Sequence, residues 1–188
     1  MSINDTTAGR LVRETIRAYL RSSATWAWQQ VGKPYLWGAE NDGSGFGAES
    51  PNWDCSEYTQ GYMTLLLRVF RNDPKFKFDD GADNQYRRLL KEGVQVGDPR
   101  PGDLGFIWAE NEIGKRVGHV VLVADFAALS RNMIVIEARG KPYSRVIVLP
   151  DYMYPRGFGA RWAGWYRMKE LDDFYKSLTE SGEGFGKC

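Results

Sequence analysis

The sequence predicts an α+β domain in which N-terminal helices pack on a five-stranded antiparallel sheet. Apolar residues at helical spacing dominate before residue 99, and short strand-like segments separated by turns dominate after it. Helices followed by a run of strands are typical of α+β proteins, whose sheets are closed by hairpins. The 188 residues suit one domain with a sizeable core, and no repeat or linker divides them. We therefore expect a single domain over residues 1–170 and a partly flexible tail over 171–188.

The helical half is predicted to contain several helices. Leu11, Ile16 and Leu20 lie near helical spacing in residues 7–21. The other predicted helices are a short one from Ser22 or Ser23 to Val31, one that follows Cys55 in SEYTQGYMTLLLRVF, and one over residues 83–92. The five predicted strands are DLGFIWAE, GHVVLVADF, MIVIEARG, SRVIVLPD and ARWAGWYRM. The tail is predicted to begin as a polar helix at Glu170 and to fray in SGEGFGKC.

Charge and hydropathy exclude two classes of partner. With 25 basic and 24 acidic residues the net charge is +1, which argues against a general nucleic-acid binder. No apolar run approaches the roughly 20 residues that cross a membrane, so no membrane insertion is expected. The N-terminal residues lack the continuous apolar stretch of a secretory signal peptide. We expect a mature protein or one that leaves the cell by another route.

A free cysteine and the single histidine are the candidates for a catalytic nucleophile and its base. Cys55 lies mid-chain and Cys188 is the last residue, so a disulfide between them is not expected. In WDCSEYTQ, Cys55 stands at the start of a predicted helix, where unpaired N–H groups and the helix dipole favour a thiolate. His119 begins the most strand-like segment and is the one candidate base for that thiol. The alternatives are a buried structural cysteine and a structural histidine.

Glu137 is the candidate that orients the histidine. If GHVVLVADF and MIVIEARG form a hairpin, the midpoint between His119 and Glu137 is residue 128, inside the expected turn AALSRN. The two side chains would then lie opposite each other on adjacent strands. Glu137 stands in an apolar strand, where a carboxylate needs a partner. The alternatives are a salt bridge to Arg139 or Arg145, or exposure to solvent.

Five motifs occur in a fixed order: GKPYLWG, DCSEYTQ, PGDLGFIW, GHVVLV and IEA. Together they resemble the NlpC-type peptidases, papain-like cysteine peptidases that cut bacterial cell-wall peptides. The resemblance covers about residues 23–166. It implies a papain-like fold, with Cys55 as nucleophile, His119 as base and Glu137 at the position of the third polar residue.

The resemblance also implies roles for residues beside the nucleophile. Tyr35 matches a tyrosine whose hydroxyl, with the Cys55 backbone N–H, would stabilise the oxyanion. Asp54 and Ser56 match positions that hold the free amino end of the substrate, and Asp54 could also cap the helix. Trp37 is a candidate substrate-binding residue. Core packing is the alternative for Tyr35 and Trp37.

The sequence departs from the family's usual motifs at three places. Glu57 replaces a glycine after DCS, and Ala39 replaces the second glycine of WGG. The stretch ENDGSGFGAESPN lengthens the segment between Tyr35 and Cys55 and is expected to overhang the cleft and reshape specificity. Its Gly-Ser-Gly-Phe-Gly run lacks the context of a dinucleotide-binding motif. Its acidic residues could hold calcium, although the EF-hand spacing is absent.

The expected function is a peptidoglycan hydrolase that cleaves an amide bond of the stem peptide, such as that between γ-D-glutamate and the diamino acid, through an acyl-enzyme on Cys55. No cofactor is expected, and one histidine with two distant cysteines makes no convincing zinc site. The expected place of action is the bacterial cell wall, reached as part of a phage virion, as a lysis protein or as an injected effector. The alternatives are an acyltransferase or another amidase on the same fold, and an inactive structural component of a phage tail.

Overall fold

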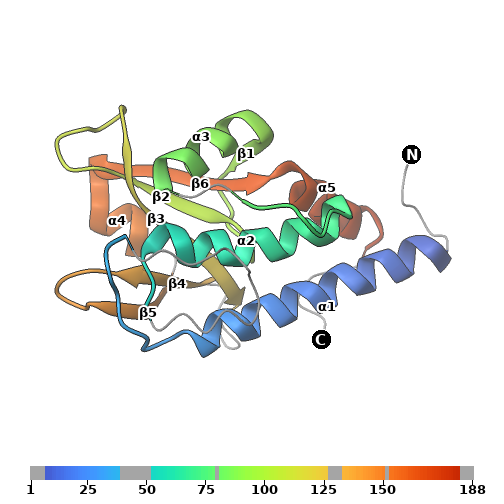
Figure 1. Cartoon of the computed structure of the whole chain (residues 1–188). Coiled ribbons are helices and arrows are strands. Elements are labelled where there is room, and N and C mark those ends of the chain that lie inside the picture. The colour runs from blue at the N-terminus through green and yellow to red at the C-terminus, as the bar shows by residue number, and fades with distance from the viewer. Residues whose placement is uncertain (1–6, 39–51, 79–80, 127–132, 151–152, 183–188) are drawn as a thin grey trace.

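The computed structural model describes residues 7–38, 52–78, 81–126, 133–150 and 153–182. Its helices and strands form one α+β arrangement around an antiparallel sheet (Figure 1). The helices are α1 (Thr7–Gln29), α2 (Cys55–Arg71), α3 (Ala82–Glu92), α4 (Met153–Phe158) and α5 (Lys169–Glu180), with a 3-10 turn, η1 (Gly159–Arg161). The strands are β1 (Gly93–Val96), β2 (Leu104–Trp108), β3 (Val117–Phe126), β4 (Met133–Arg139), β5 (Arg145–Pro150) and β6 (Trp162–Met168).

The sheet has six strands, not the expected five, in the order β1-β6-β2-β3-β4-β5. The five predicted strands correspond to β2 through β6, and all neighbouring strands are antiparallel. The additional strand, β1, directly follows α3 and pairs only with β6. The predicted antiparallel sheet is therefore confirmed, with one short edge strand added.

Side chains on the two faces of the sheet belong to two different hydrophobic clusters, because successive residues of a strand point to opposite faces. The larger cluster lies between the sheet and the helices and includes Leu104, Phe106, Val120, Leu122 and Ile136. The smaller cluster contains Ile107, Val121, Val123 and Val135 and is joined by Tyr154 of α4 and Trp165 of β6. Both faces of the sheet are thus covered.

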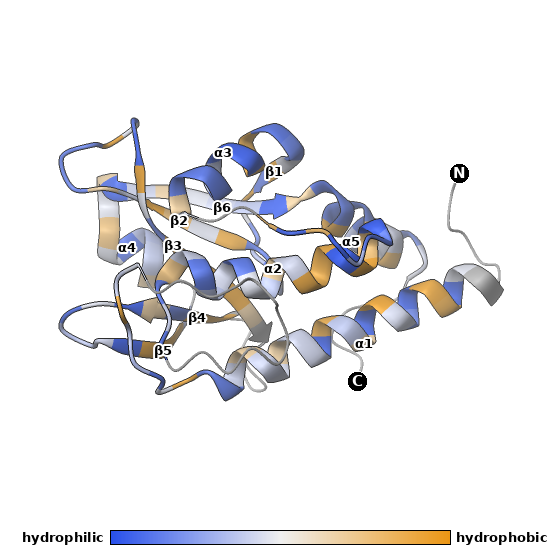
Figure 2. Cartoon of the chain, viewed as in Figure 1, coloured by the Kyte–Doolittle hydropathy of each residue, from blue (hydrophilic) through white to orange (hydrophobic). Residues whose placement is uncertain are grey.

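Helix α1 is one continuous helix, so the predicted break at Ser22 or Ser23 is wrong. Ser23 is fully buried inside it, which shows that packing of this face overrides the preference of serine for a helix start. Figure 1 shows α1 beside α2, and the two helices are in contact. The predicted helix over residues 83–92 is α3, which is mostly hydrophilic in Figure 2. Only Gln85 and Leu89 of this helix are buried.

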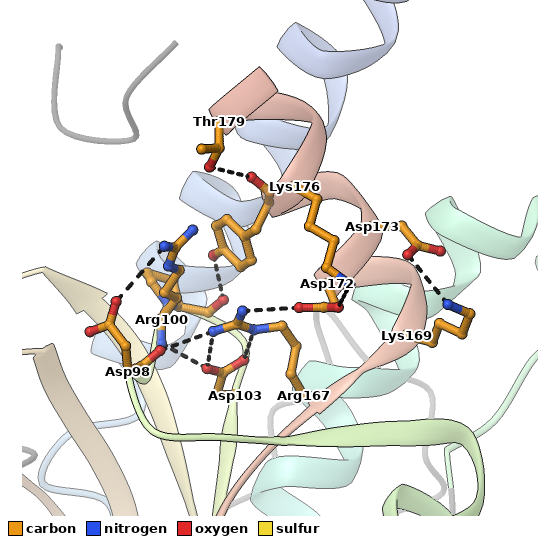
Figure 3. A network of polar contacts seen from close by, with 11 residues as sticks. Asp98, Arg100, Asp103, Arg167, Lys169, Asp172, Asp173, Lys176 and Thr179 are labelled. Carbon is orange, nitrogen blue, oxygen red and sulfur yellow. Dashed lines mark hydrogen bonds and ion pairs between the residues drawn. The ribbon is translucent and has the colours of Figure 1, made fainter. Parts of the chain in front are cut away.

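The segment after residue 170 belongs to the packed core as far as α5 extends. Leu171, Phe174 and Leu178 of α5 are buried in the larger cluster. A buried ion network fixes the start of α5 to the sheet (Figure 3). In it, Arg167 of β6 binds both carboxylate oxygens of Asp103 at 2.8 Å and Oδ1 of Asp172 in α5 at 3.3 Å. The SGEGFGKC end from residue 183 lies outside the described residues.

Candidate active site

Cys55 is the first residue of α2, and Asp54 caps this helix. Asp54 has extended backbone angles, and its Oδ1 accepts the backbone N–H of Glu57 at 2.8 Å and the hydroxyl of Ser56 at 2.9 Å. The expected capping role of Asp54 is therefore present in the structure. Cys55 is a free thiol, 5% exposed, at the positive end of the helix dipole. A helix N-terminus is a position at which nucleophilic cysteines occur.

His119 lies on β3 opposite Ile107 of β2 and contacts two site residues. Its Nε2 faces Oε2 of Glu137, and its side chain is also hydrogen-bonded to Cys55. Because Nε2 faces Glu137, the nitrogen available to the thiol is Nδ1. Burial disfavours the imidazolium, but the charges of Cys55 and Glu137 and the hydrogen bonds to both outweigh it and raise the pKa of His119 to about 10.

The hairpin register differs from the one expected. Leu122 pairs with Ile136, and continuing this register places Glu137 opposite Val121, not opposite His119. A register shift between Val123 and Asp125 moves the strands past each other, and such bulges are invisible in a count of residues. His119 and Glu137 are therefore diagonal neighbours on one face. They still meet, because a diagonal spacing is within reach of long side chains.

Glu137 has a fully buried side chain with three partners. Its Oε2 faces His119, while Oε1 forms a salt bridge with Nε of Arg139 at 3.0 Å and accepts the hydroxyl of Tyr154 at 3.1 Å. The contact with the histidine and the salt bridge to Arg139, which were alternatives for this residue, are thus both present. Solvent exposure is excluded. Arg145 instead donates to the backbone carbonyl of Tyr143 at 3.3 Å.

Tyr35 lies beside the thiol on the segment that follows α1. Its backbone N–H donates to the carbonyl of Ser144 at 3.0 Å, and it forms an isolated bridge with Trp53, two residues before Cys55. Burial, followed by the nearby charges of Cys55 and Asp54, raises the pKa of Tyr35 above its ordinary value. The hydroxyl therefore stays protonated near neutral pH, as a hydrogen-bond donor must.

Trp37 has an exposed side chain. Its side chain is 78% exposed, so packing in the core, the alternative for this residue, does not apply. The described residues show no hydrogen bond or ring contact between Trp37 and the other site residues. The structure thus brings together Cys55, His119, Glu137 and Tyr35. Trp37 lies at the surface, two residues after Tyr35 in the sequence.

Tyr154 was not expected at the site. It belongs to α4, which no pattern in the sequence had predicted. The one available signal was Pro155, since proline is tolerated in the first turn of a helix. That signal could locate the helix but not the contact of Tyr154 with Glu137.

The described residues contain no group of three or more His, Cys, Asp or Glu side chains that could hold a metal ion. The possible calcium ligands of the insertion lie in residues 39–51, outside the described part of the chain. None of the described helices has the length and apolar character needed to cross a membrane.

Comparisons with known proteins find similarity in structure alone. No family model matches the sequence, and no curated protein matches it. The solved structure of NlpC1 from Trichomonas vaginalis is 19% identical with a TM-score of 0.52, over 80% of this chain and 44% of that one. An NLP/P60 family protein similar to lipoprotein from Staphylococcus aureus is 17% identical with a TM-score of 0.52, over 80% of this chain and 41% of that one. The chain matches less than half the length of each, and it has the fold of the NlpC/P60 proteins.

Proposed function

We propose that this chain is a cysteine peptidase or amidase that hydrolyses an amide bond in the stem peptides of bacterial peptidoglycan. The single observation that carries the proposal is the continuous line of contacts from Cys55 through His119 to the buried Glu137. A nucleophile, a base and a group that orients the base form the constellation of covalent acyl-transfer catalysis. The choice of peptidoglycan follows the resemblance of the five motifs and the NlpC/P60 fold.

In the first half of the proposed reaction, the Cys55 thiolate attacks the amide carbonyl carbon and forms a C–S bond. The oxyanion accepts hydrogen bonds from the Tyr35 hydroxyl and the Cys55 backbone N–H. Bond formation removes the thiolate charge that holds the proton on His119, so the imidazolium becomes a stronger acid. It then protonates the leaving nitrogen, the C–N bond breaks, and a thioester and a free amine result.

In the second half, neutral His119 removes a proton from water, which attacks the thioester carbonyl. The C–S bond breaks, the carboxylic acid product leaves, and the thiolate–imidazolium pair is restored. Asp54 and Ser56, next to the nucleophile, are proposed to hold the free amino end of the stem peptide. Exposed Trp37 is proposed to contact the substrate outside the immediate site, and the cell wall is the proposed place of action.

Digestion of purified peptidoglycan, followed by mass spectrometry of the fragments, tests the function. The wild type should release fragments with new amino and carboxyl ends, and Cys55→Ala should release none. If wild type and Cys55→Ala give the same fragments, the proposal is wrong. Transfer of the acyl group to an amine instead of water would appear as a new amide and would identify an acyltransferase.

Reactivity of the thiol separates an active site from an inert scaffold. An alkylating reagent at mildly acidic pH should label wild-type Cys55 quickly and His119→Ala slowly, because only the former has the imidazolium beside the thiolate. Equal and slow labelling of both proteins would indicate an inactive structural component.

A further inference from the structure

The buried carboxylate of Glu137 contacts two basic side chains, His119 and Arg139. Its Oε2 faces the His119 ring, and its Oε1 is shared by Arg139, at 3.0 Å, and the Tyr154 hydroxyl, at 3.1 Å. The three partners come from different elements, β3, β4 and α4. Because Arg139 is always charged, the buried carboxylate keeps a cationic partner whether or not the histidine is protonated.

Arg139 is held in place by aromatic rings as well as by Glu137. Its guanidinium carbon lies 5.3 Å from the centre of the Phe158 ring and 5.7 Å from that of Tyr143. The side chain is only 20% exposed. Cation–π contacts on two rings and an ion pair together restrict its position, so its charge stays beside the carboxylate.

We propose that Arg139, assisted by Tyr154, is a positioning residue that limits how strongly Glu137 holds the proton of His119. This inference rests on the proposed function, because it concerns the acid that must protonate the leaving amine. Arg139 acts through Glu137 and does not touch the thiol.

The charged and titratable groups around this site fix the direction of the effect. His119 faces Cys55 of α2 and Glu137 of β4, and Glu137 faces His119, Arg139 and Tyr154. Without Arg139, loss of the imidazolium proton would leave a buried carboxylate with no cation beside it. The imidazolium would then keep its proton too tightly to donate it. With Arg139 present, the carboxylate has a cationic partner both when His119 is protonated and when it is neutral. The imidazolium can then donate its proton to the leaving amine.

The single histidine of the chain makes a direct test possible. In protein labelled with carbon-13 at the histidine ring, all ring signals come from His119 and report its titration. The titration is best made in a Cys55→Ala background, because removing the thiolate isolates the interaction with Glu137. Arg139→Met should raise the imidazole pKa by about one unit, and Arg139→Lys should leave it near the parent value because the charge is kept.

Arg145→Met is the matched control. Arg145 pairs with Arg139 in the register of β4 and β5, carries the same charge, is exposed, and donates to a backbone carbonyl and not to Glu137. Its removal should not move the titration. Tyr154→Phe, which removes one hydrogen bond to the carboxylate and no charge, should raise the pKa by less than Arg139→Met. In the active protein, Arg139→Met should lower kcat more than it changes KM.

The two hypotheses fail in different ways. If the imidazole pKa is the same with and without Cys55, the thiol and the imidazole are not paired and the proposed function is wrong. If that difference is present but Arg139→Met shifts the titration no more than Arg145→Met, or shifts it downward, the role of Arg139 is refuted and the proposed function stands. Should Arg139→Met not fold, an unchanged titration in Tyr154→Phe would overturn the inference.

Discussion

Replacement of Arg167, which lies outside the candidate site, is predicted to destabilise the fold strongly. Arg167 is 5% exposed and makes two 2.8 Å bonds to the fully buried Asp103 (Figure 3). Arg167→Met keeps much of the side-chain volume but leaves that carboxylate with the backbone N–H of Arg100, at 2.7 Å, as its remaining described hydrogen bond. Asp172 loses less, because Lys176 still binds it at 2.7 Å.

The magnitude follows from the charge that is left behind. Removing one partner of a buried ion pair costs about 3–5 kcal/mol, because the other charge stays buried without its ion-pair partner. For a chain of this length, that loss corresponds to a fall in Tm on the order of 10 °C. Lys169→Met is the matched control: it breaks an exposed ion pair with Asp173 at 3.4 Å and should cost less than about 1 kcal/mol.

The cost should also depend on pH. Burial raises the pKa of Asp103 to about 6, even with Arg167 beside it, so its charged form is disfavoured in the fold. Loss of Arg167 raises that pKa further. As the pH falls from 8 towards 6, the folded variant then holds a proton on Asp103 that wild type takes up only near pH 6. The stability that Arg167→Met loses relative to wild type should therefore shrink by about 1.4 kcal/mol for each unit by which the pH falls over that interval.

Urea unfolding at pH 8 and pH 6 checks both statements. A double variant, Asp103→Leu with Arg167→Met, should be more stable than Arg167→Met alone, because it removes the orphaned charge. A cost of Arg167→Met that is no larger than that of Lys169→Met at pH 8 would refute the reasoning. So would a cost that grows as the pH falls.

Three other substitutions test the site and the sheet. Tyr35→Phe should lower kcat on peptidoglycan fragments by about 10²–10³-fold with little change in Tm, since it removes the hydroxyl proposed to stabilise the oxyanion; an unchanged kcat would exclude that role. Asp54→Ala should cost about 1 kcal/mol in urea unfolding, whereas Asp54→Asn keeps the helix cap. A loss of activity in Asp54→Asn would then show that the carboxylate charge contributes to activity, and full activity would show that Asp54 acts only as a helix cap. Gly105→Ala places a Cβ 2.5 Å from the Trp165 ring and should cost about 1–3 kcal/mol, while Gly97→Ala, with no atom within 4 Å, should be nearly neutral; equal costs would contradict this packing.

The sequence predicted the fold well where local pattern and packing agree. Strands such as VVLV in β3 are apolar on both faces because both faces of the sheet are covered. The strand β1 was missed because its four residues are mostly half-buried, and its existence depends on pairing with β6 at the far end of the chain. The continuity of α1 through Ser23 was also missed, because it depends on tertiary burial.

The site was predictable where the chain offers few candidate residues of the type needed. One histidine and one mid-chain cysteine left a single possible pair, and the structure brings them together. The partner of Glu137 was harder to predict, because a bulge shifts the register and a buried carboxylate can satisfy two cations at once. Tyr154 was beyond prediction, because α4 is short and its contact with β4 is set by packing on the second face of the sheet.

The segment from Gly32 to Tyr35 ties the candidate site to an outer strand. Gly32 N–H donates to the carbonyl of Val146, Val146 N–H donates to that of Lys33, and Tyr35 N–H donates to that of Ser144. These bonds occupy main-chain groups at the start of β5 that a strand from another molecule would otherwise bind. The peptide that delivers the tyrosine hydroxyl therefore also protects this end of the sheet from strand addition. A substitution that weakens this attachment should promote self-association and also displace Tyr35, the proposed oxyanion donor.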